Sequence, residues 1–401
     1  MTQKSSFANR NRNIIAKIIL ILTLWLLTSC KQENQVINTT CHNISTISLN
    51  LEKQDKNINL SDIVDSVYYI HLHSPKDDIV GEIRKIVDWK NHYYISDFND
   101  NLFCFRKDGV LKYKLNKVGK GPGEYLKLVD FTIDKVNQSL VISDDFKWRY
   151  YNLENGTYTK ETSAPTPAYK MECLSNGQYL LDASFNTHDA FLENDNLFSI
   201  ILTDRNGTPT QKHLPYSKLL RPQINIYWKN EQFFSYKQEV LFNRMLSDTV
   251  FALTKNGLQC KYFIDYGKHK LPGDILETDK VSAYMVKIHE YALLSEVIET
   301  DRHLIIYSQF ENKPIVSTYN KDQSKVINCT YKGSETFHND INAIPITPFT
   351  AITENERLIS IVYPDDIISK AKNSSSKYLQ SFADTLSPYG NPILAISIPK
   401  K

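Results

Sequence analysis

Apolar residues along this chain come in short runs separated by clusters of Gly, Asn and Asp. Such runs, bounded by turn residues, predict β-strands. One unit repeats clearly: Tyr93–Asp97 matches Leu140–Asp144 47 residues later, and Gly109 and Gly156 each follow the Asp by twelve residues. A period of roughly 40–50 residues that holds four short strands is typical of a β-propeller blade.

Later units match this pattern less closely. They begin near Gly177, Asp248, Leu304 and Leu358, and the last apolar run is Ile393–Ile398. A ring of blades leaves no long sheet edge unpaired when one blade takes strands from both ends of the chain. We therefore expect Val67–Leu72 to pair with the C-terminal strand. Helix is expected to be scarce, and residues 279–299 form the best helical window because Tyr284, Ile288 and Tyr291 recur at helical spacing.

Residues Gly119–Tyr125 read Gly-Lys-Gly-Pro-Gly-Glu-Tyr and stand between two strand runs. A Gly/Pro cluster in that place marks a turn. The run resembles the signature of bacterial six-bladed β-propeller lipoproteins, NHL-like propellers of unassigned function. Further resemblances lie in Asp248–Phe251, Phe263–Gly267 and Asn391–Leu394. The resemblance spans residues 61–401 and implies an all-β fold of six four-stranded antiparallel blades, whereas length alone also allows seven.

The geometry of a blade predicts which loops lie together at one end of the propeller and could form a binding face. Successive strands reverse direction, so the turn between strands two and three lies at the same end as the connection from strand four to the next blade. These loops are 97–101, 116–127 and 144–147. Loops on a rigid scaffold often carry function. The candidate residues are Asp97, Asn99, Asp100, Lys120, Glu124, Asp144 and Asp145. The alternative is that these Asp and Asn side chains bond the backbone of their own turns.

The N-terminus differs from the rest of the chain. Residues 1–29 carry four basic and no acidic residues before the apolar run Ile18–Leu27, which predicts a secretory signal peptide. That run is shorter than the roughly 20 residues that a membrane span needs. Leu27–Cys30 resembles a bacterial lipobox, which implies lipidation (palmitate) at Cys30; an incidental Cys after a plain signal is the alternative. Residues 30–60 are polar and are expected to form a tether.

Composition limits the partners. Cleavage before Cys30 lowers the formal charge from +2 to −2, which argues against a nucleic-acid footprint. Five cysteines follow Cys30 at wide spacings without a Cys-x-x-Cys pair, so zinc and redox motifs are not predicted. We expect them to be single buried thiols.

Local motifs for chemistry are weak. Lys120 is followed by Gly and Pro rather than by Ser or Thr at the start of a helix, so a phosphate-binding loop is not predicted. Asp97, Asn99 and Asn101 resemble the start of a calcium loop but lack its later Gly and Glu. His71 and His73 alternate along a strand and are expected to point to one face, without an assignable third metal ligand.

Two functions remain open. The first is a non-enzymatic, lipid-anchored outer-membrane module, facing the periplasm or the cell surface, that binds an envelope protein or a glycan and needs no cofactor. The second is a metal-dependent lactonase or esterase with its site at the channel mouth. The second requires acids, Asn or His from several blades to converge on one point.

Overall fold

The computed structural model describes residues 35–36, 41, 44–75, 78–144, 146–185, 188–220, 233–275, 281–333 and 335–401. The expected signal peptide, Cys30 and Asp145 lie outside these residues. Within the described ranges, no helix is both long enough and apolar enough to cross a membrane.

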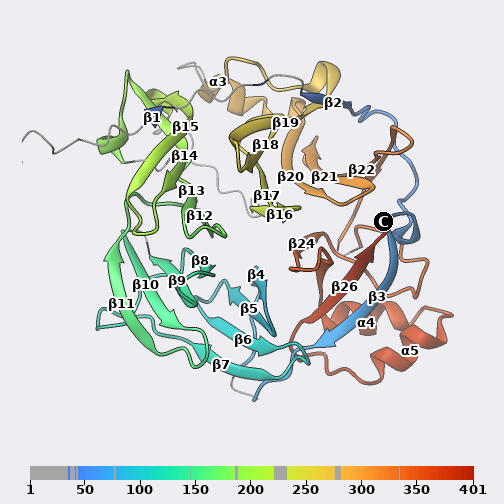
Figure 1. Cartoon of the computed structure of the whole chain (residues 1–401). Helices are drawn as coiled ribbons and strands as arrows, with labels where there is room; N and C mark the ends of the chain where they lie inside the picture. Colours follow the sequence, from blue (N-terminus) through green and yellow to red (C-terminus); the bar gives the residue numbers. More distant parts are fainter. Residues whose placement is uncertain are drawn as a thin grey trace, which may run out of the picture. The chain divides into compact units, whose positions relative to one another are not determined.

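Six antiparallel sheets are arranged in a ring, which confirms the six-bladed β-propeller (Figure 1). Blade one contains β4 (Ile83–Trp89), β5 (His92–Asp97), β6 (Leu102–Arg106) and β7 (Leu111–Leu115). Blade two contains β8 (Asp130–Asp134), β9 (Ser139–Asp144), β10 (Lys147–Asn152) and β11 (Tyr158–Ser163). Blade three contains β12 (Lys170–Cys173), β13 (Tyr179–Asp182), β14 (Asn196–Thr203) and β15 (Pro209–Ser217).

The other three blades follow the same plan. Blade four contains β16 (Phe234–Tyr236), β17 (Glu239–Asn243), β18 (Thr249–Thr254) and β19 (Gly257–Asp265). Blade five contains β20 (Leu293–Glu299), β21 (His303–Phe310), β22 (Lys313–Asn320) and β23 (Lys325–Thr330). Blade six contains β24 (Phe349–Ile352), β25 (Leu358–Val362), β26 (Ile393–Pro399) and the N-terminal β3 (Val64–His71).

The ring closes as the sequence predicts. β3 is the outer strand of blade six and pairs antiparallel with β26, Tyr69 opposite Ala395. Figure 1 shows these two strands, from opposite ends of the chain, side by side. The closure therefore joins the two ends by a full ladder of backbone hydrogen bonds.

The core lies between the faces of neighbouring blades. Phe131 and Leu140 of blade two pack with Tyr94 and Leu102 of blade one in a single apolar cluster. Strands in the middle of a blade are buried on both faces; β6, which reads Leu-Phe-Cys-Phe-Arg, is exposed only at its last residue. This double burial explains why their apolar residues run continuously instead of alternating.

The helical window was wrong over its second half. In the described part of the window, which begins at residue 281, only α3 (Val281–Val286) and the short turn η4 (Ile288–Glu290) are helical, and Leu293–Glu299 forms β20, the first strand of blade five. Burial of this segment on both faces outweighs its helical spacing, because Val297 and Ile298 favour a strand. Two further helices, α4 (Pro364–Ala371) and α5 (Lys377–Ala383), form an insertion between β25 and β26.

The N-terminal segment adds a further strand to one of the six sheets. β2 (Ser45–Ser48) pairs in parallel with β19 and extends blade four, so strand pairing with the propeller begins before residue 61. The remaining short elements are β1 (Gln35–Val36), α2 (Leu60–Ile63), η1 (Asp189–Phe191), η2 (Lys218–Leu220) and η3 (Gly267–His269).

The cysteines correct the expectation of five single thiols. Cys104, Cys173 and Cys329 are buried free thiols, as expected. Cys41 and Cys260 instead form a disulfide, which ties the N-terminal segment to β19 of blade four. The 219 residues between them leave no local spacing from which this pair can be recognised.

Candidate functional site

The Gly119–Tyr125 loop is closed by its own hydrogen bonds. The Gly119 amide donates to the Tyr125 carbonyl (3.0 Å), and the Gly121 amide donates to the Glu124 carboxylate (2.7 Å). The Tyr125 side chain is fully buried, and its hydroxyl donates to the Asp100 carbonyl (2.8 Å). Burial raises the pKa of Tyr125 to about 12. These bonds and the buried Tyr125 side chain hold the loop in place between blades one and two.

Asp97 caps the turn that follows β5. Its buried carboxylate accepts hydrogen bonds from the amides of Gly81 (3.1 Å), Asn99 (3.0 Å) and Asn101 (3.0 Å). The Asn101 side-chain amide also donates to it (2.9 Å). With these donors around it, the carboxylate stabilises the turn.

Asp144 takes the same position in blade two, at the end of β9. Its carboxylate accepts from the Leu126 amide (2.8 Å) and pairs with the buried Arg149 (2.7 Å). Asp100 likewise accepts from the Leu128 amide (3.1 Å). The loops therefore meet at one end of the blades, as their strand order predicts, but these carboxylates bond nearby backbone.

Asn99 and Lys120 are the exposed members of the candidate face. Glu124 is half-buried against Gly121, and Asp145 lies outside the described residues. Whether this end binds a partner stays a prediction. Among the residues that the structure describes, no group of three His, Cys, Asp or Glu is placed to hold a metal ion.

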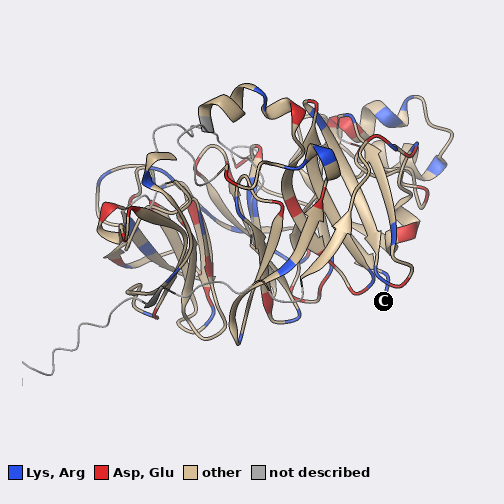
Figure 2. Ribbon diagram, turned by 90° about the horizontal axis from the view of Figure 1, so that it is seen from above, with Lys and Arg blue, Asp and Glu red and all other residues tan. Residues whose placement is uncertain are grey.

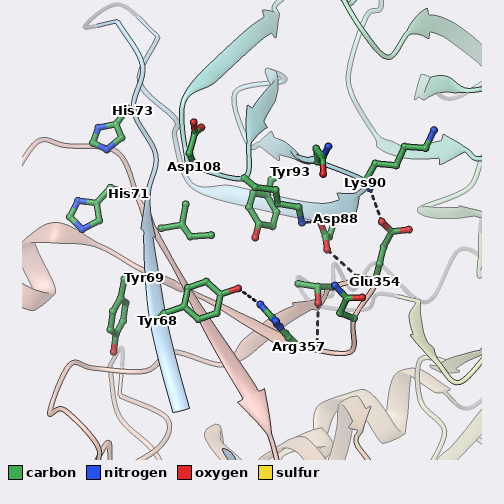
Figure 3. A pocket seen from close by; sticks show the side chains of 15 residues that line it. Tyr68, Tyr69, His71, His73, Asp88, Lys90, Tyr93, Asp108, Glu354 and Arg357 are labelled. Atoms are coloured by element: carbon green, nitrogen blue, oxygen red, sulfur yellow. Dashed lines mark hydrogen bonds and ion pairs between the residues drawn. The ribbon is translucent and has the colours of Figure 1, made fainter. Parts of the chain in front are cut away.

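The opposite end of the blades holds a pocket of about 730 Å³, here called the seam pocket because it lies where blade six meets blade one (Figure 3). It is formed by β3, the β24–β25 turn, the β4–β5 turn and the β6–β7 turn. The side chains on its inner wall are Tyr68, Asp88, Lys90, Asn91, Tyr93, Lys107, Asp108, Glu354, Asn355 and Arg357.

Charged groups in the seam pocket are balanced and partly paired. Arg357 donates to the Tyr68 hydroxyl (2.7 Å) and lies over its ring. Lys107 pairs with Asp88 and lies 4.1 Å from the centre of the Tyr93 ring. These contacts hold two tyrosine rings and a guanidinium in fixed positions on the pocket wall (Figure 3).

Other polar groups of the seam pocket remain unused. Asn91 and Asn355 are exposed, and their side-chain amides make no hydrogen bond with the described residues. His71 and His73 stack on each other with ring centres 6.0 Å apart, which confirms that they share a face; this face of β3 is opposite to that of Tyr68 (Figure 3), and His71 contacts Phe382 there. Burial, and then the neighbouring His73, lower the pKa of His71. The pocket thus offers neutral donors and acceptors beside aromatic faces.

Sequence reasoning did not find the seam pocket. Its wall joins Tyr68, Asp88 and Arg357, which are brought together only when β3 closes the ring. The pairing of residues 67–72 with the C-terminal strand was the one available signal. Even that pairing does not say which outward side chains meet the turns of blade one.

The ring of six sheets and its closure by β3 define a six-bladed β-propeller. The chain belongs to a family described as a domain of unknown function, DUF4934, whose model matches residues 44–397. A comparison with curated proteins finds no match.

One solved structure supports this fold. A Bacteroides fragilis protein classed as exported has a TM-score of 0.70 at 17% identity, over 90% of this chain and 100% of that one. A Bacteroides vulgatus member of the DUF4221 family has a TM-score of 0.48 at 8% identity, over 84% of this chain and 97% of that one. The first of these similarities supports the fold and says nothing of a ligand.

Proposed function

We propose that this protein is a lipid-anchored β-propeller of the bacterial outer membrane that binds a glycan segment in the seam pocket without catalysing a reaction. The observation that carries this proposal is the seam pocket itself. Its volume of about 730 Å³ lies in the size range of small-ligand sites, roughly 300–1,000 Å³.

The side chains of the seam pocket favour a sugar over a protein surface. Protein interfaces place a largely apolar, well-packed core at their centre. This pocket instead combines the Tyr68 ring with free amides at Asn91 and Asn355 and with paired charges of both signs. Aromatic faces pack against the apolar face of a sugar ring, while amides and charged groups bond its hydroxyls.

Export and anchoring are supported by independent features. The N-terminal pattern of basic residues, apolar run and Leu27–Cys30 is typical of a lipoprotein signal. The Cys41–Cys260 disulfide suits an oxidising compartment such as the periplasm. Two acyl chains or more anchor a protein stably, since each buried CH₂ contributes about 0.8 kcal/mol.

Glycan binding is tested with the full-length protein in non-ionic detergent on a glycan array, followed by calorimetry on the best ligand. Tyr68→Ala and Arg357→Ala are each expected to weaken binding at least tenfold. Tyr389→Ala is the matched control, because Tyr389 is 89% exposed and lies outside the pocket. Equal binding by all three variants would place the ligand elsewhere and contradict the proposal.

The anchor is tested by fractionation and palmitate labelling in cells. Cys30→Ala is expected to abolish labelling and to release the folded protein from the membrane fraction. Cys329→Ala, which removes a buried thiol, is expected to keep both. Continued labelling of the Cys30 variant would contradict lipidation at this residue.

The hydrolase alternative depends on metal ligands from several blades converging at the channel mouth. Among the described residues, no group of three His, Cys, Asp or Glu is placed to hold a metal ion, and no specific observation favours this function.

A further inference from the structure

A second, smaller pocket lies between blade five and the part of blade six where β3 begins and β26 ends. Its volume is about 260 Å³, and it opens among the β20–β21 turn, the β22–β23 turn and the residues that flank β3 and β26. These turns join strands one to two and three to four, so the pocket lies at the same end of the blades as the seam pocket. The side chains that matter are Asp62, Arg302, His303, Asn320, Lys325 and Lys400.

The charge of this pocket is unbalanced. Arg302, Lys325 and Lys400 line it against one acid, Asp62. Arg302 pairs with Asp322 outside the lining (3.3 Å). Neither Lys325 nor Lys400 forms an ion pair within the described part of the chain. The pocket therefore keeps two ammonium groups outside any ion pair, with Asp62 as the one acid of its lining.

His303 adds a buried donor without a partner. The Asn320 side-chain oxygen accepts from the amides of Asp322 and Gln323 (both 3.0 Å), which orients its NH₂ toward His303. That NH₂ lies 3.1 Å from His303 Nε2, so Nε2 accepts and the proton resides on Nδ1. His303 is 5% exposed, and its Nδ1 has no hydrogen-bond partner among the described residues.

The protonation state of His303 fits this assignment. Burial, and then the charge of Arg302, lower its pKa, so the ring is neutral at pH 7. A neutral ring holds one N–H, here on Nδ1. A buried N–H without an acceptor is costly, and native proteins rarely leave one unsatisfied.

We propose that this pocket is an anion site for one oxyanion group, a carboxylate, sulfate or phosphate, held by Lys325, Lys400 and Arg302. The three cations supply the charge for such a group, and His303 lines the same pocket. Its volume, below that of drug-sized ligand sites (roughly 300–1,000 Å³), suits a single charged group rather than a whole polymer segment. The proposal does not depend on glycan binding in the seam pocket.

The test is a thermal-shift and calorimetric titration of the full-length protein in non-ionic detergent. The probes are inorganic phosphate, inorganic sulfate and glucuronate, each against sodium chloride at matched ionic strength. An oxyanion that binds only the native state raises Tm with concentration. The combined variant Lys325→Ala/Lys400→Ala is expected to weaken binding at least tenfold. Lys372→Ala/Lys377→Ala, which removes two exposed lysines outside the pocket, is the charge-matched control.

The outcomes separate the sources of the anion. Binding by phosphate and sulfate that is lost only in the pocket variant supports a site for free inorganic anions. Binding by glucuronate alone, lost in the same variant, supports a site for the carboxylate of an acidic sugar. No shift beyond that of chloride, or an equal loss in the control, overturns the proposal. Circular dichroism of both variants checks that they remain folded.

Discussion

The two ends of the propeller blades use their polar residues in opposite ways. At the end that carries Gly119–Tyr125, Asp97 and Asp144 each bond backbone amides of neighbouring loops. At the other end, two pockets flank blade six, and within the described ranges the side chains of Asn91, Asn355 and Lys325 there form no hydrogen bond or ion pair. The end that carries the more recognisable sequence motif thus has fewer polar side chains left to bind a ligand.

This difference follows from how a ring of blades is built. Asp97, Asp144 and Asp182 each end the second strand of their blade, where the chain must turn sharply. Asp182 accepts from the Ser184 amide (2.9 Å) and hydroxyl (2.6 Å). An acid in this position stabilises the turn in blades one to three, so a motif that repeats between blades indicates architecture. Groups that occur once, at the closure, are free to differ in function.

Charge over the molecule agrees with this division. Figure 2 shows Lys and Arg interspersed with Asp and Glu along the strands and loops of the blades. The excess of positive charge in the small pocket is therefore a local feature. The predictions below run from the largest expected effect on stability to the smallest.

Asp97→Ala is expected to lower the free energy of unfolding by about 4 kcal/mol, because it leaves several amide donors of a buried turn unsatisfied. Urea denaturation measures this change. Lys120→Ala, an exposed change at the same end, is expected to stay within about 0.5 kcal/mol of wild type. A mild effect of the Asp97 change would mean that this carboxylate is free to act elsewhere.

Asp248 lies between β17 and β18, at the same end of the blades, and breaks the pattern. One of its carboxylate oxygens is buried without a partner in the described structure. Burial raises the pKa of Asp248 to about 7, although the hydrogen bond from the Leu271 amide lowers it. Its folded pKa exceeds the unfolded value, so stability is complete below about pH 4 and falls as pH rises through about 7.

Asp248→Asn should therefore stabilise the protein by about 3 kcal/mol at pH 8 and change little at pH 4. Thermal and urea unfolding at both pH values measure this difference. Asp204→Asn, a change at a turn carboxylate that bonds its own loop amides, is the control. A stabilisation that does not depend on pH would show that Asp248 is already neutral or solvated.

Gly123→Ala is expected to cost about 2 kcal/mol. Gly123 has a φ of +74°, and a Cβ would lie 2.7 Å from the Tyr158 ring. Gly273→Ala is the control, since a Cβ there meets no atom within 4 Å. Denaturation curves with a changed midpoint for the first variant alone would place the strain in the loop. Equal midpoints would mean that the Gly119–Tyr125 motif is kept for something other than its backbone shape.

The sequence predicts the features that depend on local patterns and not those that depend on contacts between residues far apart in the chain. The 47-residue repeat and the pairing of 67–72 with the final strand predict a closed ring of blades from local strand patterns, whereas the number six came from the resemblance in Gly119–Tyr125 and the later segments. The Cys41–Cys260 bond, the helices α4 and α5, and the seam pocket were missed. Each depends on contacts between distant segments or on an insertion whose packing no periodicity encodes.

Asn91→Ala and Asn355→Ala are expected to have the smallest effect on stability, within about 0.5 kcal/mol, because both residues are exposed and their side-chain amides are unpaired in the described structure. Each removes a hydrogen-bonding group from the seam pocket, so glycan affinity should fall about threefold to tenfold, equivalent to about 0.7–1.4 kcal/mol. Calorimetry and urea denaturation on the same preparations give both numbers. Loss of stability without loss of affinity would assign these amides to architecture and remove the contrast between the two ends of the blades.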